Sequence, residues 1–287
     1  MPNNIQLFKN YIDLLDTVYK QASLTAILDS DTSLLQMTAN GKEFLIPKME
    51  MDGLGEYSRQ TGYPVGSVTL DFETKKPNFD RARVFQVDKM DNIETAKIAF
   101  GRLASEFIRT KAVPEIDATR FATYCAKGTP VVSAALATGE AWLKAISTAV
   151  AAMDDAEVPA EGRILYITPT GLRAIQDLDT TKSREVLASF TAIVKVPQAR
   201  FYTAIKSLSG GTGEEKGGYE KATTGKELNF QIVHPSALMQ VAKDIVNKIV
   251  DPETNQDGDW WKFFFHLYGI NEVYENKKSG IYSHSKA

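Results

Sequence analysis

Apolar side chains recur every three or four residues between residues 91 and 112, as on one face of a helix. The apolar stripe contains Ile93, Ala96, Phe100, Leu103 and Phe107. Asp91 can cap the first turn, and Glu94 completes a capping box. Because Pro114 disfavours the helical region for the residue before it, we expect the helix to end or bend there. The pattern predicts a rod about 30 Å long, with Ile93, Phe100, Leu103 and Phe107 forming its core face.

Two segments before this rod have more apolar surface than they can cover themselves. Residues 5–20 have a helical pattern with a wide apolar face, which must lie on the core or on a neighbouring subunit. Short strands are predicted at residues 44–46, 68–73 and 81–88. The first of them ends at Pro47, and a glycine-rich connection follows at residues 53–66. A long, thin β arm of this kind is marginal alone and needs an outside surface.

The second half of the chain alternates strand and helix patterns. Strands are predicted at residues 163–168, 192–196, 201–205, 230–233 and 260–270. Helices are predicted from Pro114 to Gly128, at residues 140–153, from Thr168 and Pro169 onwards, and from Pro235 through Val250. Residues 271–275 and 280–284 are expected to pair as a terminal β ribbon. The alternation predicts a small α/β domain after a small-residue linker at residues 129–139.

Composition excludes several classes of protein. The chain has 287 residues, of which 43% are hydrophobic and 24% charged, as in ordinary globular proteins. A net charge of −3 argues against a protein whose main task is to bind nucleic acid. One cysteine, Cys125, permits no intrachain disulfide and fits a reducing compartment. We recognise no secretory signal and no membrane-spanning run, so no membrane partner is expected.

The sequence offers little catalytic chemistry. His266 lies in an apolar strand and is expected to be a packed residue. The glycines of residues 209–226 do not match a phosphate-binding loop, because GxxxxGK[ST] is absent. The first positions of residues 253–264 resemble those of a calcium-binding loop, but Phe264 occupies the position of its last ligand. No nucleophile, base and orienting acid occur at a recognisable spacing. We therefore expect a structural protein, with no enzyme activity, no cofactor and no metal.

Several stretches together resemble the major capsid protein of tailed bacteriophages, the Hong Kong 97 fold. They are IPKMEMDGLGEYSRQTGY, VTLDFETKKPNFDRARVFQVDKMD, NIETAKIAFGRLASEFIRTKAVPEIDATRF, GRILYITPTGLRAIQ and NEVYENKKSGIYSH. The resemblance implies an α+β fold with an N-terminal arm, an extended β loop, a peripheral domain with a long spine helix, and an α/β axial domain. The implied boundaries are 1–40 for the arm, 41–90 for the loop, 91–134 for the peripheral domain, 135–251 for the axial domain, and 252–287 for strands that return to the peripheral domain.

This resemblance implies a shell protein that assembles with itself into pentamers and hexamers and encloses packaged double-stranded DNA by confinement. The implied location is the virion, after assembly in the host cytoplasm. A separate scaffolding protein, a portal and decoration proteins are implied partners. Covalent joining of a lysine to an asparagine, known in some relatives, stays open, because the sequence does not bring Lys75, Lys76 or Asn78 to a catalytic carboxylate.

Candidate intersubunit contacts come from the extended loop and the strand after it, because tyrosine and arginine are enriched at interface hot spots. The candidates are Leu54, Tyr57, Arg59, Tyr63, Lys75, Lys76, Arg81 and Arg83. The loop tip is expected either near residues 53–66 or near residues 74–80. Two alternatives to a phage capsid remain: an encapsulin-like cellular shell of the same fold, and a small α/β enzyme or nucleotide-binding protein. The enzyme would need a convergent polar pocket.

Overall fold

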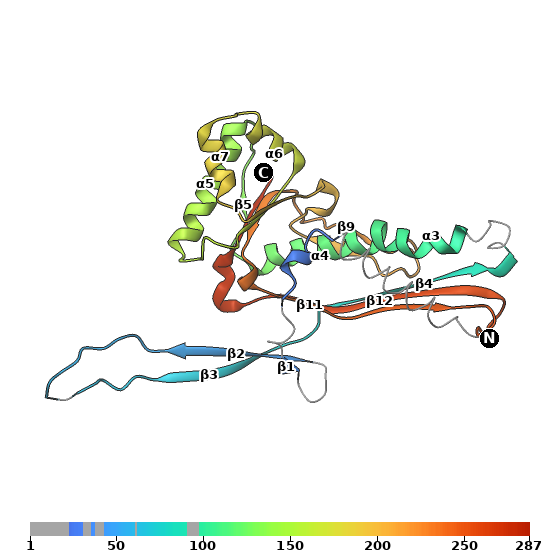
Figure 1. Cartoon of the computed structure of the whole chain (residues 1–287), viewed down its shortest axis with the longest axis horizontal. Helices are drawn as coiled ribbons and strands as arrows, with labels where there is room; N and C mark the ends of the chain where they lie inside the picture. Colours follow the sequence, from blue (N-terminus) through green and yellow to red (C-terminus); the bar gives the residue numbers. More distant parts are fainter. Residues whose placement is uncertain (1–22, 31–35, 38–42, 61, 91–97) are drawn as a thin grey trace.

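The computed structural model describes residues 23–30, 36–37, 43–60, 62–90 and 98–287. Two principal sheets lie beside a long helical rod, and a separate hairpin extends away from both (Figure 1). The predicted α+β class is confirmed. The predicted helix at residues 5–20, the Asp91 cap and Ile93 lie outside the described residues.

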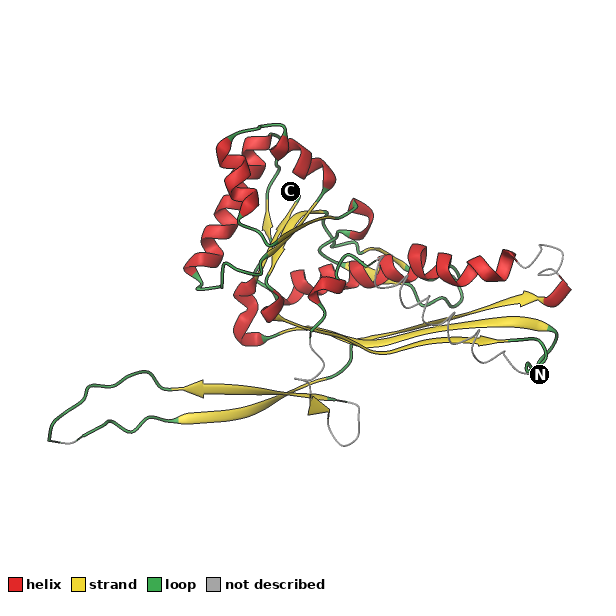
Figure 2. Cartoon of the chain, viewed as in Figure 1, coloured by secondary structure: helices red, strands yellow, loops and turns green. Residues whose placement is uncertain are grey.

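The rod is continuous through three helical segments (Figure 2). They are α3 (Ile98–Phe107), the π-helical turn η3 (Ile108–Ala112) and α4 (Val113–Lys127). The expected end or bend at Pro114 is wrong, since Ala112 and Val113 both keep helical backbone angles. A proline ring crowds the carbonyl one turn earlier, and the wider turn of η3 shifts the hydrogen-bond register just before it. As predicted, α4 ends at Gly128.

The rod packs on a three-stranded antiparallel sheet in the order β11-β12-β4. These strands are β4 (Phe79–Asp88), β11 (Leu238–Val250) and β12 (Trp260–Val273). Alternate residues of β12 form the core beneath the rod, where Phe263 is fully buried. The ring of Phe107 meets those of Phe85 and Phe265 at centroid distances of 4.7 and 5.6 Å.

Residues 238–250 form strand β11, so the predicted helix from Pro235 through Val250 is wrong. The helical structure in this segment is limited to a 3-10 turn, η5 (Pro235–Ala237). The run LMQVAKDIVNKIV is rich in β-branched residues that suit a strand, and its spacing also fits a helix. Pairing with the long strand β12 selects the strand conformation. The paired residues run from Leu238 opposite Val273 to Val250 opposite Lys262.

A five-stranded sheet forms the second layer, in the order β5-β13-β10-β6-β7. Its strands are β5 (Val132–Ser133), β6 (Ile164–Ile167), β7 (Ala192–Lys195), β10 (Leu228–Val233) and β13 (Ile281–Ser285). β6 and β7 are parallel, as the predicted α/β domain requires. The predicted terminal ribbon is wrong, since β13 pairs with β10 and β5, and residues 271–273 finish β12. The sheet pairing does not test the predicted domain boundaries, which stay predictions.

Helices cover both faces of this sheet. The group on one face is α5 (Gly139–Asp155), α6 (Pro169–Gln176) and α7 (Thr181–Ala188). α4 covers the other face, where Phe121 contacts Tyr166 at 5.1 Å between ring centroids. Thr168 caps α6 as predicted, by accepting from the Gly171 N–H. α7 begins with a capping box of Thr180 and Ser183, which was not recognised in the sequence.

Shorter elements complete the chain. They are η1 (Ala26–Leu28), β1 (Gln36–Met37), η4 (Gln198–Arg200), β8 (Ile205–Ser207), β9 (Tyr219–Lys221) and η6 (Glu275–Gly280). The strand predicted at residues 201–205 is mostly irregular, with one bridge between Tyr202 and Glu227. The glycine-rich residues 209–218 form the loop between the paired strands β8 and β9.

Residues 23–30 are fastened to α4 of the same chain by a buried polar cluster. Asp117 is fully buried and accepts hydrogen bonds from the Thr25 hydroxyl at 2.7 Å and the Leu24 N–H at 3.2 Å. Arg120 donates to Thr25 at 2.8 Å and to Asp29 at 3.1 Å. Residues 23–30 of the predicted N-terminal arm are therefore part of the folded body.

Candidate intersubunit surface

Two strands that leave the body form a long antiparallel hairpin, β2 (Phe44–Met51) and β3 (Val68–Lys75). Figure 1 shows it projecting away from both sheets. β2 continues through Pro47, so the short strand predicted to end there is too short. Among the described residues, β1 pairs with Phe44 and Leu45 alone. Pro47 therefore has no described partner on the outer edge of β2, where a strand tolerates proline.

The hairpin has one apolar and one polar face. Met51 lies opposite Val68 and Met49 opposite Leu70, and directly opposed residues of a sheet share a face. Phe72 continues that face along β3, whereas Thr69 and Asp71 point to the other. One chain alone therefore presents a stripe of large apolar side chains.

Nothing in the described part of the chain covers this apolar face. Met49, Leu70 and Phe72 are 55%, 50% and 54% exposed, although equivalent residues in β6 are fully buried. Most of the well-exposed large hydrophobic side chains among the described residues belong to this hairpin. Apolar surface gathered in this way marks an interaction site rather than scattered surface residues.

The hairpin ends in a loop of residues 52–67, which we call the tip loop. Asp52 and Ser67 close it, since the Ser67 N–H donates to the Asp52 carboxylate at 2.7 Å. Tyr57 and Tyr63 contact each other at 5.0 Å between ring centroids, and Leu54 is fully exposed. The tip is thus near residues 53–66, and the alternative at residues 74–80 is wrong because those residues join the hairpin to β4.

Two contacts with the body hold the base of the hairpin. Phe44 is buried against Met239 and Ile270. At the other strand, Asn78 donates to the Asn271 carbonyl at 2.7 Å and accepts from its N–H at 2.9 Å. The direction of the hairpin is therefore set by the body, while its apolar face is left open.

The structure can be compared with solved structures once this geometry is known. No protein-family model and no curated protein matches the sequence. A structure from Mycobacterium phage Che8 is similar with a TM-score of 0.57 and 14% identity, over 84% of each chain. The capsid of cyanophage P-SCSP1u gives 0.54 and 14% over 88% of this chain and 85% of that one. A virus-like particle from Pyrococcus furiosus gives 0.57 and 14% over 97% and 99%.

The chain has the Hong Kong 97-type capsid fold. The similarity covers most of the chain in each case, and the predicted resemblance is confirmed at the level of fold. In this fold the rod α3–η3–α4 corresponds to the predicted spine helix. The β2–β3 hairpin corresponds to the predicted extended loop.

The predicted contact residues fall into two groups. Leu54, Tyr57, Arg59 and Tyr63 are together on the tip loop and exposed. Lys75, Lys76, Arg81 and Arg83 are at the hairpin base and on β4. Their roles between subunits stay predictions.

The second group makes contacts inside the chain. Lys75 pairs with Glu73, which raises the pKa of the lysine, and Lys76 lies 3.4 Å from Glu43. Arg81 pairs with Glu115 at 2.7 Å. Arg83 donates to the Glu215 carbonyl at 2.8 Å. All four basic residues therefore have partners within one copy, so the tip loop is the stronger candidate surface.

The predicted core of the spine helix is partly visible. Leu103 and Phe107 pack into the cluster under the rod. Phe100 lies in α3, and its side chain is outside the described residues, as is Ile93. The observed part of the stripe faces the sheet as expected.

Glu272 brings a lysine and an asparagine together, which sequence reasoning did not find. Its carboxylate binds the Lys127 ammonium and also lies 3.3 Å from the Asn78 side-chain nitrogen. The signal was absent because the three residues are far apart in sequence. The amide of Asn78 is already bonded to both backbone groups of Asn271, which favours a structural clamp at the hairpin base.

The structure also places two other side chains considered in the sequence, His266 and Cys125. His266 is not packed in the core, as had been expected, but is 37% exposed in its side chain and 2.7 Å from Asp80. Burial raises the pKa of Cys125 to about 12, so its thiol stays protonated near neutral pH. Among the described residues, no cluster of metal-ligating side chains occurs and no helix has the length and apolar character of a membrane span.

Proposed function

We propose that this protein is the major subunit of a capsid shell and that it assembles with copies of itself. The observation that carries the proposal is the β2–β3 hairpin, whose apolar face is exposed on a chain with a capsid fold. An isolated two-stranded hairpin is marginal in water. A neighbouring copy supplies the missing cover, and repetition of such a contact around symmetry axes closes a shell.

The net charge of the chain bears on how packaged DNA would be held in the shell. With a net charge of −3 the protein has no excess of cations for a phosphate backbone. Packaged DNA would therefore be retained by confinement. On this proposal the protein is a structural protein of the virion of a tailed phage, assembled in the host cytoplasm with a separate scaffolding protein and a portal, and with decoration proteins as further partners.

A cellular compartment is the second candidate. It is favoured by one observation, the similarity to the Pyrococcus furiosus particle over 97% of this chain and 99% of that one. Purified particles separate the two candidates. Nuclease-resistant double-stranded DNA supports a phage head, whereas a co-purifying protein cargo without DNA supports the compartment.

The shell itself is tested by expressing the full chain and measuring particle size by sedimentation and electron microscopy. Closed particles of uniform diameter are expected. A stable small oligomer at all concentrations would contradict the proposal, because an enzyme of this size behaves in that way.

Hydrogen exchange tests whether the hairpin is the assembly contact. Residues 52–67 should exchange quickly in the dissociated subunit and slowly in the particle, since their backbone groups gain cover only on assembly. Strand β6 is the internal control, because it is buried within one chain and should be protected equally in both states. Equal protection of the tip loop in both states would mean that it packs on its own subunit.

A further inference from the structure

A ribbon of residues 201–228, which we call the β8–β9 ribbon, connects the two principal sheets. Its base belongs to the five-stranded sheet, because Phe201 is fully buried in the core beside that sheet and Leu228 begins β10. The Leu228 N–H donates to the Phe201 carbonyl at 3.0 Å, which ties the two ends of the ribbon together. Its far end, the loop of residues 208–218, reaches strand β4 of the three-stranded sheet.

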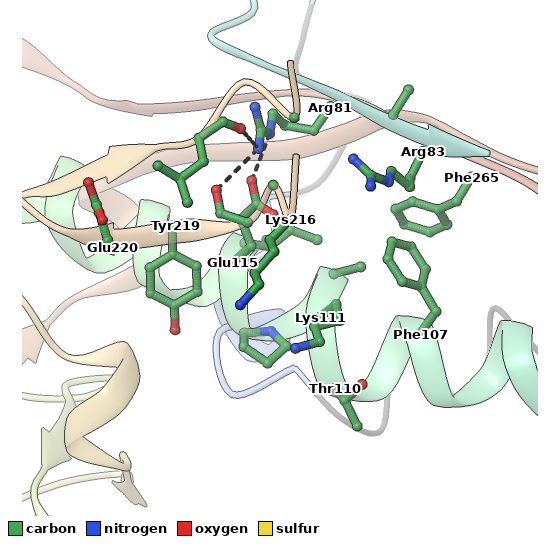
Figure 3. A pocket seen from close by; sticks show the side chains of 18 of the residues that line it. Arg81, Arg83, Phe107, Thr110, Lys111, Glu115, Lys216, Tyr219, Glu220 and Phe265 are labelled. Carbon is green, nitrogen blue, oxygen red and sulfur yellow. Dashed lines mark hydrogen bonds and ion pairs between the residues drawn. The ribbon is translucent and has the colours of Figure 1, made fainter. Parts of the chain in front are cut away.

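Two arginines of β4 hold the far end of the ribbon (Figure 3). Arg81 donates to the carbonyls of Leu208 and Gly218, at 2.7 and 3.3 Å. Arg83 donates to the Glu215 carbonyl at 2.8 Å. Hydrogen bonds from the opposite sheet therefore reach both ends and the middle of the loop.

The loop leaves room for the Arg83 guanidinium. Gly210 and Gly217 have positive φ angles of 76° and 60°, which disfavour any residue with a side chain. A β-carbon at Gly210 would lie 2.8 Å from the Arg83 Nη1, and one at Gly217 would lie 3.4 Å from it. Two glycines of this loop are therefore explained by the close approach of an arginine from the other sheet.

Hydrogen bonds within the ribbon hold the loop in this shape. The Glu214 carboxylate accepts from the Lys206 ammonium at 2.8 Å, and from the Ser209 N–H and hydroxyl at 2.7 and 2.9 Å. These bonds, that of Lys206 first, lower the pKa of Glu214 to about 2, so the carboxylate is ionised near neutral pH. The Glu215 carboxylate accepts from the Gly213 N–H at 2.8 Å. The ribbon thus presents a preformed loop to the two arginines.

The loop stands clear of the rod beneath it. A cavity of about 1360 Å³ lies between β4, the rod around η3 and the ribbon, with Phe107 and Thr110 on the rod side and Gly217 on the loop side. The described bonds from the loop to the three-stranded sheet are those of Arg81 and Arg83. If these bonds were lost, the cavity would give the loop space to move.

We propose that the β8–β9 ribbon is a brace that fixes the angle between the five-stranded and three-stranded sheets, and that this angle sets the curvature of the shell. Helix α4 already joins the two sheets, and a second connection away from the helix axis resists the rotation that one connection permits. The inference rests on the proposed shell function, since the shape of one subunit is repeated at every contact around the symmetry axes.

A release variant and a matched control test the brace in the full chain. The release variant is Arg81→Ala, Arg83→Ala and Glu115→Gln, and the control is Glu115→Gln alone. Glu115 is included because its carboxylate lies 2.7 Å from Arg81 in a partly buried position and would otherwise lose its partner. In the control, both arginines keep their carbonyl acceptors on the ribbon.

A second variant reaches the same contact from the other side. An Asn-Gly turn in place of residues 209–217 shortens the loop between β8 and β9 and leaves β4 unchanged. It should act in the same direction as the release variant. Agreement between the two variants would assign the effect to the brace, whereas an effect of the arginine substitutions alone would assign it to β4 and overturn the proposal.

The angle is measured in the dissociated subunit by the distance between two spin labels. The labels are attached at Lys144→Cys on α5 and Lys248→Cys on β11, which are exposed positions beside the two different sheets. The native Cys125 is buried, and its raised pKa of about 12 keeps the thiol unreactive. The distance distribution of the release variant should be about twofold wider than that of the control, because the bonds that restrain the ribbon are gone. Equal widths would overturn the brace.

Particle size tests the link to curvature. Electron microscopy should show one diameter for the control and a range of diameters for the release variant. Particles of the release variant with the control's single diameter would overturn this link. If the wild type forms no closed particles, the shell function fails, while the label distances in the subunit still decide whether the ribbon is a brace.

Discussion

The five-stranded sheet and the β2–β3 hairpin are built from similar apolar residues and have opposite surroundings. In β6, Leu165, Tyr166 and Ile167 are fully buried between α4 on one side and α5 and α6 on the other. In β3, Leu70 and Phe72 are half exposed. The difference shows that apolar content identifies a surface to be covered. The same chain supplies the cover in the sheet, whereas on the proposed function a neighbouring copy supplies it in the hairpin.

This comparison has an energetic side. Full burial of a large apolar side chain contributes about 1.5–3 kcal/mol. In the sheet that free energy stabilises the folded subunit. On the proposed function, burial of the hairpin face occurs only when another copy covers it, so that free energy contributes to assembly and not to the free energy of unfolding of one chain. Substitutions in the two regions should therefore separate folding from assembly.

The largest effect is expected for Phe107→Asp in the spine helix. Phe107 is half-buried and packs against the rings of Phe85, Phe263 and Phe265. A carboxylate in its place loses these ring contacts and is incompletely solvated, at a cost of several kcal/mol. We expect insoluble or unfolded protein, measured by the soluble fraction and circular dichroism; Leu103→Asp should act in the same direction. The control is Phe72→Asp on the hairpin, which should give a folded subunit that fails to assemble. Soluble, correctly sized particles from Phe107→Asp would contradict the packing of this residue between the rod and the sheet.

A smaller effect is expected for a matched pair of phenylalanine truncations. Phe230 in β10 is fully buried and stacks on His284 at 5.0 Å between ring centroids, so Phe230→Ala should lower the free energy of unfolding by about 3–5 kcal/mol. Phe72→Ala should change it by less than about 0.5 kcal/mol, because the side chain is 54% exposed. Denaturant unfolding of the dissociated subunits measures both.

In an assembly assay the order of the two variants should reverse, with Phe72→Ala having the larger effect. Phe72→Ala removes apolar surface that we assign to the contact between copies, so its particles should form only at higher protein concentration. A loss of subunit stability for Phe72→Ala as large as that for Phe230→Ala would mean that the hairpin face is covered within the chain.

Much of the sheet region could be predicted from the sequence, for a physical reason. Its signals are local: the buried run at β6, the Thr168 cap of α6 and the helical stripe of α5 all lie within a few residues. The hairpin strand β3 was also predictable, since its apolar and polar residues alternate. The position of the hairpin tip could not be decided from the sequence, because both the glycine-rich segment at residues 53–66 and the lysine-containing segment at residues 74–80 could form the turn.

What failed depended on distant partners. β11 was taken for a helix, and only its pairing with β12 selects the strand. Pro114 has a local preference against helix, which the π-helical turn before it accommodates. The contacts of Glu272 with Lys127 and Asn78 could not be predicted at all, since these residues are far apart in the chain and come together only in the fold.

The smallest effect on the subunit is expected for Tyr57→Ala combined with Arg59→Ala. Both side chains are exposed on the tip loop, and the one contact described for them is that between Tyr57 and Tyr63. The thermal midpoint of the dissociated subunit should stay nearly unchanged. The particle should lose resistance to denaturant, because contacts present only in the assembled state stabilise only that state.

Both halves of this result are needed. Leu70→Ala on the apolar face is the matched control for the hairpin stem, and it should weaken particles without touching the tip. If the Tyr57 and Arg59 variant leaves particle stability unchanged while Leu70→Ala lowers it, the stem of the hairpin makes the contact and the tip does not. A lower midpoint of the free subunit would instead show that the tip loop packs on its own chain, and the difference between the two regions would then be one of degree.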